Sequence, residues 1–457
     1  RELTKHLGLP EYVDLNDALR ENISVIVVSI LNRIPVFIVG NPGSSKSLAM
    51  EIISSNFKGK HSSNSFAQSF PSLQIFTFQC SPTSKGKQIE EVFENARKHQ
   101  RNVSSDTIVV LLLNEVGLLE QSHYNPIQVV NNELEEPQIS VVGLSNWSLD
   151  PSTNSKVICL SRPEPTINDL KNTLSVMANS IQLESSSYFL AKAYHEVYKT
   201  QTRKDFFGLR DFYSMIKFVM KNMKDKQSSL VDVLVRGICR NFGGRPEEMT
   251  RILSIFGNCV GIEMSSMGTL PKTLDLIKDN LRDTRARHLM LLTRNNAALS
   301  ILFNQGILSH SSTDVIFGTD LAQGKDLDIH MCSAMQRIRS CMSQGKTVVL
   351  VNCEGLYESL YDLFNMQYLS YGGNRYASLI IGTHSKQCIV HKKFRVIIVT
   401  EQDHAYRELA SPLLNRFEKQ VLIRQEIFED HHHNLLGKLQ NWCAHVCAPD
   451  QLDSTFA

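Results

Sequence analysis

The chain has 457 residues, of which 42% are hydrophobic and 21% charged, and its formal net charge at pH 7 is only +2. This composition excludes a disordered chain and a fibrous repeat, and the length corresponds to about two to four folded domains. A net charge so close to neutral argues against a surface built mainly to hold nucleic acid or an anionic membrane, so we expect no nucleic-acid partner. The first residue is Arg1 rather than Met, and we therefore expect a piece of a longer protein.

The stretch that comes nearest to a membrane span is ISVIVVSILNRIPVFIVG, residues 23–40. Asn32, Arg33 and Pro35 interrupt it at mid-length, which favours a buried helix that ends before the proline. A short buried strand at 36–39 is expected to follow. We therefore expect no transmembrane segment.

The stretch IVGNPGSSKS, residues 38–47, is a glycine-rich turn between an expected strand and an expected helix. Such a turn points backbone N–H groups and a helix N-terminus at one spot, which suits a polyphosphate. The usual pattern is G-x-x-x-x-G-K-[ST], and here Ser45 replaces the second glycine. We expect Lys46 to reach the phosphates of ATP and the Ser47 hydroxyl to hold Mg²⁺. The expected nucleotide-binding residues are Gly40, Asn41, Pro42, Gly43, Ser44, Ser45, Lys46, Ser47 and Leu48.

Apolar strands alternate with helices along the next part of the chain. Strands are expected at 73–80, 107–113 and 139–144, and an amphipathic helix at 87–100. Strands that are apolar throughout are typical of a parallel sheet covered by helices on both faces, which is an α/β fold. Since such sheets bind ligands at the carboxyl ends of their strands, the polar residues that end these strands are the candidates for a site.

Two of these strand ends carry residues that suit nucleotide hydrolysis, namely Asn114 with Glu115 and, on the next strand, Asn146. We expect Glu115 to polarise the attacking water as general base, and Asn146 to bridge this water and the γ-phosphate. Aspartate usually precedes such a glutamate, whereas Asn114 offers one neutral oxygen, so Ser47 and Asn114 should bind Mg²⁺ weakly. The alternatives are a solvated strand end for Glu115 and a turn-forming role for Asn146.

The pattern divides the chain into a first α/β core at 1–164, a helical lid subdomain at 165–280, a second α/β core at 281–425 and the start of a second lid at 426–457. Arg210 opens a lid helix and can bring a guanidinium to the phosphates; the alternative is a solvated or salt-bridged helix residue. In the second core we expect strands at 288–293, 314–317, 347–352 and 394–400, and helical stretches at 331–342 and 355–369.

The second core lacks the marks of a working nucleotide site. Its Gly-Lys-Thr string, residues 345–347, follows a helix and precedes a strand, which is the reverse of the required order. Its first strand runs into residues 294–297, which contain no glycine to expose backbone amides. We therefore expect this core not to hydrolyse nucleotide.

The second core can still serve its neighbour through Arg416, in the stretch SPLLNRF at 411–417. Ring ATPases carry an arginine near this position that reaches the nucleotide of the adjacent module, and such a finger is worth about 10³ to 10⁵ in rate. The alternative is a surface arginine paired with Glu418.

Several stretches together resemble the mysterin family of giant AAA+ and RING-finger E3 ubiquitin ligases. They are GNPGSSKSLA, NEVGLLE, GLSNWSLDP, FFGLRDFYS, LYESLYDLFNMQYLSYGG, LIIGTH and PLLNRFEK. The resemblance covers essentially the whole chain and implies two consecutive AAA+ modules, the fourth and fifth of a six-module ATPase ring. The roles it implies are ATP and Mg²⁺ binding for Lys46 and Ser47, hydrolysis for Glu115, sensing for Asn146 and Arg210, and a finger for Arg416.

Two departures from the family pattern shape the expected function. Asn114 stands where the family has aspartate, and Ser155-Lys156 replaces an Asn-Arg finger toward the preceding module. We therefore expect an ATP-binding segment that hydrolyses slowly and is loosely coupled upstream. One alternative is a nucleotide-gated scaffold that binds ATP without hydrolysing it. The other is a force-generating unfoldase, which would require several sites that hydrolyse ATP.

The resemblance also implies the setting of the parent protein. The partners it implies are neighbouring AAA+ modules of the same chain, a ubiquitin-conjugating enzyme and ubiquitin. It implies a cytoplasmic protein that also associates with lipid droplets.

Overall fold

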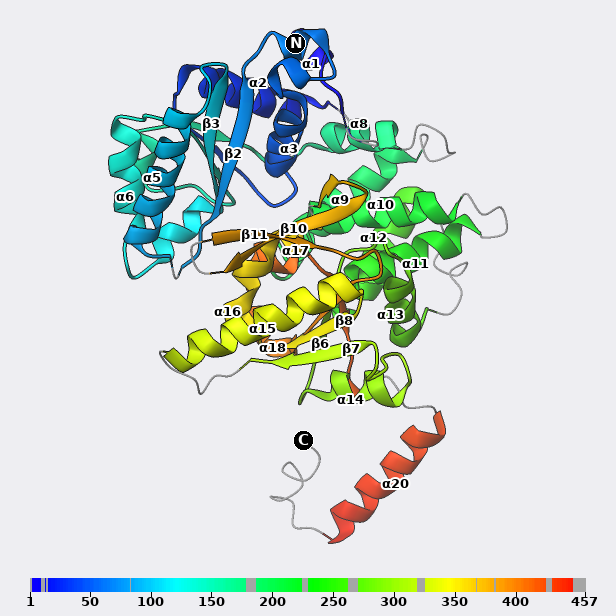
Figure 1. Cartoon of the computed structure of the whole chain (residues 1–457). Helices are drawn as coiled ribbons and strands as arrows, with labels where there is room; N and C mark the ends of the chain where they lie inside the picture. Colours follow the sequence, from blue (N-terminus) through cyan, green and yellow to red (C-terminus); the bar gives the residue numbers. More distant parts are fainter. Residues whose placement is uncertain are drawn as a thin grey trace.

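In the computed structural model, two α/β cores are connected in the chain by a set of helices (Figure 1). The structure describes residues 2–9, 13, 15–82, 84–177, 186–223, 229–261, 270–318, 325–366, 368–381, 384–424 and 430–446. In Figure 1 the first core is coloured blue to cyan, the connecting helices green, and the second core yellow-green to orange.

The first core is a parallel sheet of five strands in the order β2-β3-β4-β1-β5. Its strands are β1 (Val36–Val39), β2 (Ser72–Gln79), β3 (Thr107–Asn114), β4 (Ser140–Ser145) and β5 (Ile158–Ser161). Its helices are α1 (Glu2–Lys5), α2 (Asp17–Asn32), α3 (Lys46–Asn56), η1 (Gly59–His61), α4 (Ser65–Gln68), α5 (Gly86–Asn102), η2 (Val116–Gln121), α6 (Pro126–Glu135) and α7 (Pro151–Asn154).

Helices cover both faces of this sheet, which explains its continuous apolar strands. Along β3, Val110 and Leu112 join the hydrophobic core under α2 and α3. Their neighbours Leu111 and Leu113 join the core under α5 and α6. Successive side chains of a strand point to opposite faces of the sheet, so each strand contributes to both hydrophobic layers.

The apolar run at 23–40 divides into a helix and a strand, as the sequence predicts. Helix α2 ends at Asn32, and Arg33 caps it in a left-handed conformation with φ 55°. Pro35 then precedes β1, which is buried along its whole length. In the described part of the chain, no helix is long and apolar enough to cross a membrane.

The connecting helices enclose a core rich in phenylalanine. They are α8 (Ile167–Met177), α9 (Ser187–Thr200), α10 (Leu209–Asn222), α11 (Leu230–Phe242), α12 (Pro246–Val260) and α13 (Thr273–Arg282). Phe206, Phe207, Phe212, Phe242 and Phe256 are fully buried there. Fully buried aromatic side chains contribute much of the apolar area that holds such a bundle together.

The second core repeats the strand order of the first, as β7-β8-β12-β6-β13, with β6 in the place of β1. Its strands are β6 (Leu289–Thr293), β7 (Thr313–Phe317), β8 (Thr347–Val351), β12 (Arg395–Glu401) and β13 (Glu418–Val421). Its helices are α14 (Ala297–Asn304), α15 (Lys325–Gln344), α18 (Gln402–Arg407) and α19 (Ser411–Leu414), and α20 (Asp430–Val446) follows.

The prediction of one helical stretch at 355–369 is wrong at its end. The chain forms short helical turns, α16 (Glu354–Tyr357), η4 (Glu358–Leu360) and α17 (Tyr361–Phe364), and then a strand, β9 (Leu369–Tyr371). Gly372 and Gly373 both have positive φ and turn the chain into the antiparallel strand β10 (Asn374–Ile381), which pairs in turn with β11 (His384–Ile389). A glycine pair suits such a tight hairpin turn, and it outweighs the helical pattern before it.

A buried network of charges fixes the connecting helices to the second sheet, and we call it the α10–β13 joint. Its central pair is Asp211 on α10 and Lys419 on β13, with the lysine Nζ 3.0 Å from the carboxylate Oδ1 and neither side chain exposed. Arg287 donates to the same carboxylate at 2.8 Å, and Arg240 holds Glu418 through two hydrogen bonds of 2.9 and 2.8 Å. Burial lowers the pKa of Lys419 to about 8, and Asp211 opposes that shift.

Candidate functional site

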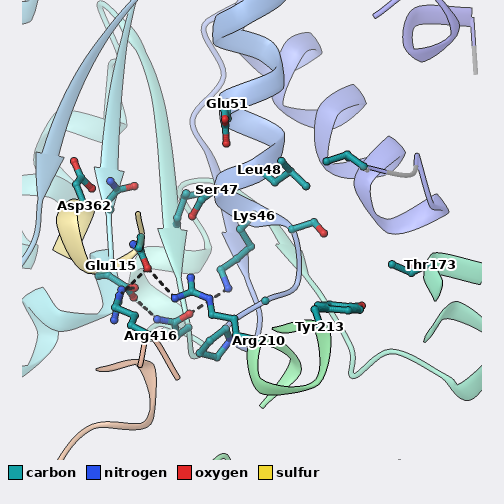
Figure 2. Close-up of a pocket in the computed structure, with 18 of the residues that line it drawn as sticks. Lys46, Ser47, Leu48, Glu51, Glu115, Thr173, Arg210, Tyr213, Asp362 and Arg416 are labelled. Atoms are coloured by element: carbon teal, nitrogen blue, oxygen red, sulfur yellow. Dashed lines mark hydrogen bonds and ion pairs between the residues drawn. The ribbon is translucent and has the colours of Figure 1, made fainter. Parts of the chain in front are cut away.

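A cavity of about 300 Å³ lies at the carboxyl ends of β1, β3 and β4 in the first core. Open α/β sheets bind their ligands at this edge. Figure 2 shows its charged side chains, with Lys46 on α3, Arg210 from the connecting helices, and Asp362 and Arg416 from the second core. The cavity is therefore built by both cores and the helices between them.

The loop between β1 and α3 forms one wall of the cavity. Gly43 has φ 95°, and Ser45, the residue before α3, has φ 60° and ψ 17°. This left-handed conformation costs a residue other than glycine about 1–2 kcal/mol, which is the physical reason that glycine is usual at position 45. The serine adopts the conformation that a glycine would take there.

Lys46 points its ammonium group into the loop and across to β4. Its Nζ donates to the carbonyl oxygens of Gly40 and Asn41, the latter at 3.0 Å, to Ser44 Oγ at 3.3 Å and to Asn146 Oδ1 at 3.2 Å. Burial lowers the pKa of Lys46 to about 8, while the nearby Glu115 carboxylate opposes the shift. The lysine is therefore a desolvated cation placed beside the amides of the loop.

The side chains of Ser47, Asn114 and Asp362 also line the cavity. Their hydroxyl, amide and carboxylate oxygens are the hard donors that Mg²⁺ prefers, so the residues present fit this ion. Burial raises the pKa of Asp362 to about 6, and Arg416 opposes the shift. Asp362 comes from α17 of the second core and brings a carboxylate to a cavity where Asn114 offers only an amide.

Glu115 follows β3 directly and lies between two hydrogen-bond donors. Its backbone is left-handed, with φ 56°, as β3 passes into the 3₁₀ turn η2. Arg416 Nη2 donates to its Oε1 at 2.9 Å, and Asn146 Nδ2 donates to its Oε2. Three residues predicted from separate strand ends or loops therefore contact one another through one carboxylate.

Arg210 and Arg416 enter the cavity from different elements (Figure 2). Arg416 is 4% exposed, and its guanidinium carbon lies 3.9 Å from the centroid of the Tyr361 ring. Burial lowers the pKa of Arg210 to about 9, and the charge of Arg416 adds to the shift. The alternative pairing of Arg416 with Glu418 is wrong, because Glu418 is held by Arg240 in the α10–β13 joint.

Most of the predicted site residues line this one cavity. They are Pro42, Gly43, Ser45, Lys46, Ser47, Leu48, Asn114, Glu115, Asn146, Arg210 and Arg416. Gly40, Asn41 and Ser44 contribute through Lys46, since each supplies an oxygen to its ammonium group.

Sequence reasoning missed several other residues of the cavity. Asn365 accepts hydrogen bonds from both Arg210 and Arg416, and Asp362 lies three residues before it. Val13 and Met177 line the cavity as apolar side chains. The stretch that contains Asp362 and Asn365 carries part of the family resemblance, but no residue pattern in it indicates a site.

In the second core a carboxylate lies at the turn that corresponds to the phosphate loop. The backbone N–H groups of Asn295 and Asn296 donate to Glu401, at the end of β12, at 3.1 and 2.8 Å. Both asparagines have left-handed backbones, with φ 52° and 51°. The Gly-Lys-Thr string at 345–347 follows α15 and runs into β8, which begins at Thr347, so a helix precedes it and a strand follows, as the sequence predicts.

The first core has its own counterpart of Arg416. Lys156 follows α7 and precedes β5, as Arg416 follows α19 and precedes β13. Its Nζ lies 2.5 Å from Glu135 Oε1 in an ion pair within the first core.

Comparison with known proteins gives consistent matches over both cores. The family described as RNF213 AAA domain matches twice, with the fourth of its series over residues 12–169 and the fifth over residues 278–428. The E3 ubiquitin-protein ligase RNF213 of Mus musculus is 34% identical over 470 residues, which cover 97% of this chain. RNF213 of Homo sapiens is 33% identical over 457 residues and 93% of the chain, and rnf213-beta of Danio rerio is 33% identical over 483 residues and 100% of the chain. The chain spans about 9% of the length of each of these relatives.

Proposed function

Because the chain belongs to the RNF213 AAA domain family, we propose that it is an ATP-binding and slowly hydrolysing AAA+ segment of an E3 ubiquitin-protein ligase. The observation that carries the proposal is the convergence of Lys46, Glu115, Asn146, Arg210 and Arg416 on one cavity. The last of these comes from the second core, which supports a site completed by the neighbouring module.

The shape of the cavity supports the binding of a nucleoside triphosphate. Lys46 and the two arginines give its phosphate end three cations, and the loop before α3 adds backbone amides. Val13 and Met177 provide apolar contact for a base, and Thr173 and Tyr213 provide hydroxyl groups.

The bonds around Glu115 suggest how hydrolysis proceeds. A γ-phosphate that reaches Arg416 competes with Glu115 for its guanidinium, since both are anions. Once released, the carboxylate can accept a proton from the attacking water, and Asn146 can orient that water. Ser47 and Asn114 would hold Mg²⁺, which would neutralise negative charge on the phosphates when bound. The neutral Asn114 weakens this metal binding, which is why we propose slow turnover.

The second candidate is a nucleotide-gated scaffold that binds ATP without hydrolysing it. Asn114 in place of a carboxylate favours it, as does the bonding of Glu115 to both Arg416 and Asn146. In that case ATP acts as a bound ligand that joins the first core to the second.

The family also gives a proposal for the parent protein. The relatives named above are described as E3 ubiquitin-protein ligases, so we propose that the parent works with a ubiquitin-conjugating enzyme and ubiquitin. We propose that the parent protein lies in the cytoplasm and associates with lipid droplets. Fluorescence imaging of the tagged parent protein tests this location.

The deciding experiment is single-turnover ATP hydrolysis by the intact parent protein, in native form and as Lys46→Ala, Glu115→Gln and Asn114→Asp. Lys46→Ala gives the background rate of ATP hydrolysis at any other sites of the parent protein. If this segment hydrolyses ATP, Glu115→Gln lowers the rate to that background and Asn114→Asp raises it above native. If ATP is retained unhydrolysed and only Lys46→Ala releases it, the scaffold is correct. Turnover that a protein substrate stimulates would favour an unfoldase instead.

A further inference from the structure

Arg210 and Arg416 come from distant parts of the chain and meet on a single oxygen atom. Arg210 opens α10, whereas Arg416 follows α19 in the second core. Asn365 Oδ1 accepts a hydrogen bond from Arg210 Nη1 at 2.8 Å and another from Arg416 Nε at 3.0 Å. A carboxamide oxygen has two lone pairs, so it can satisfy both donors at once.

The chemistry of this acceptor suits two cations that must remain available to an anion. Buried guanidinium groups repel each other, and a shared acceptor offsets part of that repulsion. A carboxylate in this position would neutralise the arginines and repel a phosphate. The neutral carboxamide holds both side chains in place without adding a negative charge, so a phosphate has to compete only with Glu115 for Arg416.

Asn365 is itself fixed to the element that carries Arg416. It caps α17, and its backbone N–H donates to Tyr361 O at 2.9 Å. The Tyr361 ring lies under the Arg416 guanidinium, and Phe364 packs edge-on against Phe417 with 4.8 Å between ring centroids. Helix α17 and the segment around Arg416 therefore form one packed unit that presents Asn365 to Arg210.

We propose that Asn365 is a positioning residue that aligns Arg210 and Arg416 for the γ-phosphate, and that it thereby makes the site distinguish ATP from ADP. This inference rests on the proposed function, because it assumes that the cavity binds a nucleotide. ADP lacks the phosphate that both arginines would share, so its dissociation constant should not depend on their alignment.

The test measures dissociation constants of a non-hydrolysable ATP analogue and of ADP, each with Mg²⁺, by calorimetry on the native chain and on Asn365→Ala and Asn365→Asp. We expect Asn365→Ala to weaken the analogue about tenfold and ADP less than twofold. Asn365→Asp should weaken the analogue further, because the new carboxylate binds the arginines and repels the γ-phosphate. The matched control is Asn222→Ala, which removes a 2.8 Å hydrogen bond to Phe218 O at the other end of α10 and should change neither constant.

The outcomes separate this inference from the proposed function. If the native chain binds neither nucleotide, the proposed function fails and the inference fails with it. If the native chain prefers the analogue and Asn365→Ala keeps that preference, the inference alone is overturned. An equal loss of affinity for both nucleotides, with a lower melting temperature, would assign Asn365 a merely structural role and would also overturn it.

Discussion

Ser45 has a left-handed backbone in which a side chain is unfavourable, so its replacement by glycine has a predictable sign. We expect Ser45→Gly to raise the free energy of unfolding by about 0.5–1 kcal/mol, because the relieved strain exceeds the larger entropy of glycine in the unfolded chain. Chemical denaturation measures this difference. Ser44→Gly is the matched control, since Ser44 is not among the residues with positive φ and should lose stability on the same change. Equal destabilisation by both substitutions would contradict the expectation.

Lys46 gives nucleotide binding a predictable dependence on pH. Because burial lowers its pKa to about 8, the ammonium is charged below that pH and becomes neutral above it. We expect ATP affinity to be flat between pH 6.5 and 7.5 and to fall above pH 8, toward about tenfold per pH unit, as a proton must be taken up on binding. Titration of a fluorescent ATP analogue across this range measures it. Between pH 7.5 and 8.5, below the pKa of about 9 of Arg210, Lys46→Met should bind more weakly and without this slope. An unchanged native affinity at pH 9.5 would contradict the assignment.

The sequence predicted those site residues that follow strands or open helices. Lys46, Glu115 and Asn146 follow buried strands, and parallel strands bring such residues to one edge. Asp362 and Asn365 could not be found in this way, because they reach the cavity from α17 of the other core. Their position depends on how two cores pack, which no local periodicity encodes.

At the scale of elements, the loop before α3 contacts the start of α10 through Gly43. A Cβ built on Gly43 would lie 2.8 Å from Leu209 Cβ, and its φ of 95° disfavours any side chain. We expect Gly43→Ala to push α10 away from the loop and to weaken ATP binding by more than tenfold, since Arg210 moves with the helix. Calorimetry measures the affinity. Gly261→Ala, at another positive φ but with no atom within 4 Å, is a control for backbone strain alone. Similar losses in both variants would show that the contact with α10 is unimportant.

Whether the sequence predicts a strand depends on how apolar the strand is. Strands β3 and β4 are apolar between their polar ends and were expected to within one residue at each end. Strand β13 reads Glu-Lys-Gln-Val and gives no apolar signal, yet it is fully buried because its polar side chains have partners in α10 and α11. A buried polar strand is stable only with those partners, so the sequence of the strand alone cannot reveal it.

At the scale of the whole molecule, the α10–β13 joint makes the connecting helices and the second core one unit. We expect Asp211→Ala to lower the free energy of unfolding by about 3–5 kcal/mol, because it removes the buried carboxylate that both Lys419 and Arg287 bind. Lys419→Met should have a smaller effect, since Asp211 keeps its 2.8 Å bond to Arg287. Urea denaturation of the two variants shows which of them loses more free energy of unfolding. A larger loss of stability in Lys419→Met would contradict this expectation and would mean that Lys419 contributes more to the α10–β13 joint than Asp211 does.

The carboxylate of Glu401, which accepts hydrogen bonds from the backbone amides of Asn295 and Asn296, limits which substitutions could create a phosphate site in the second core. The turn of the second core lacks glycine and lysine, and a carboxylate of the same core occupies two of its backbone amides. A lysine introduced into the turn would pair with Glu401, and removal of Glu401 alone would leave two amides without their acceptor. We therefore expect that no single substitution creates a phosphate site in this turn, because a lysine would have to be added and Glu401 removed together. The second core therefore fills its own turn, while its residues Asp362, Asn365 and Arg416 line the cavity of the first core.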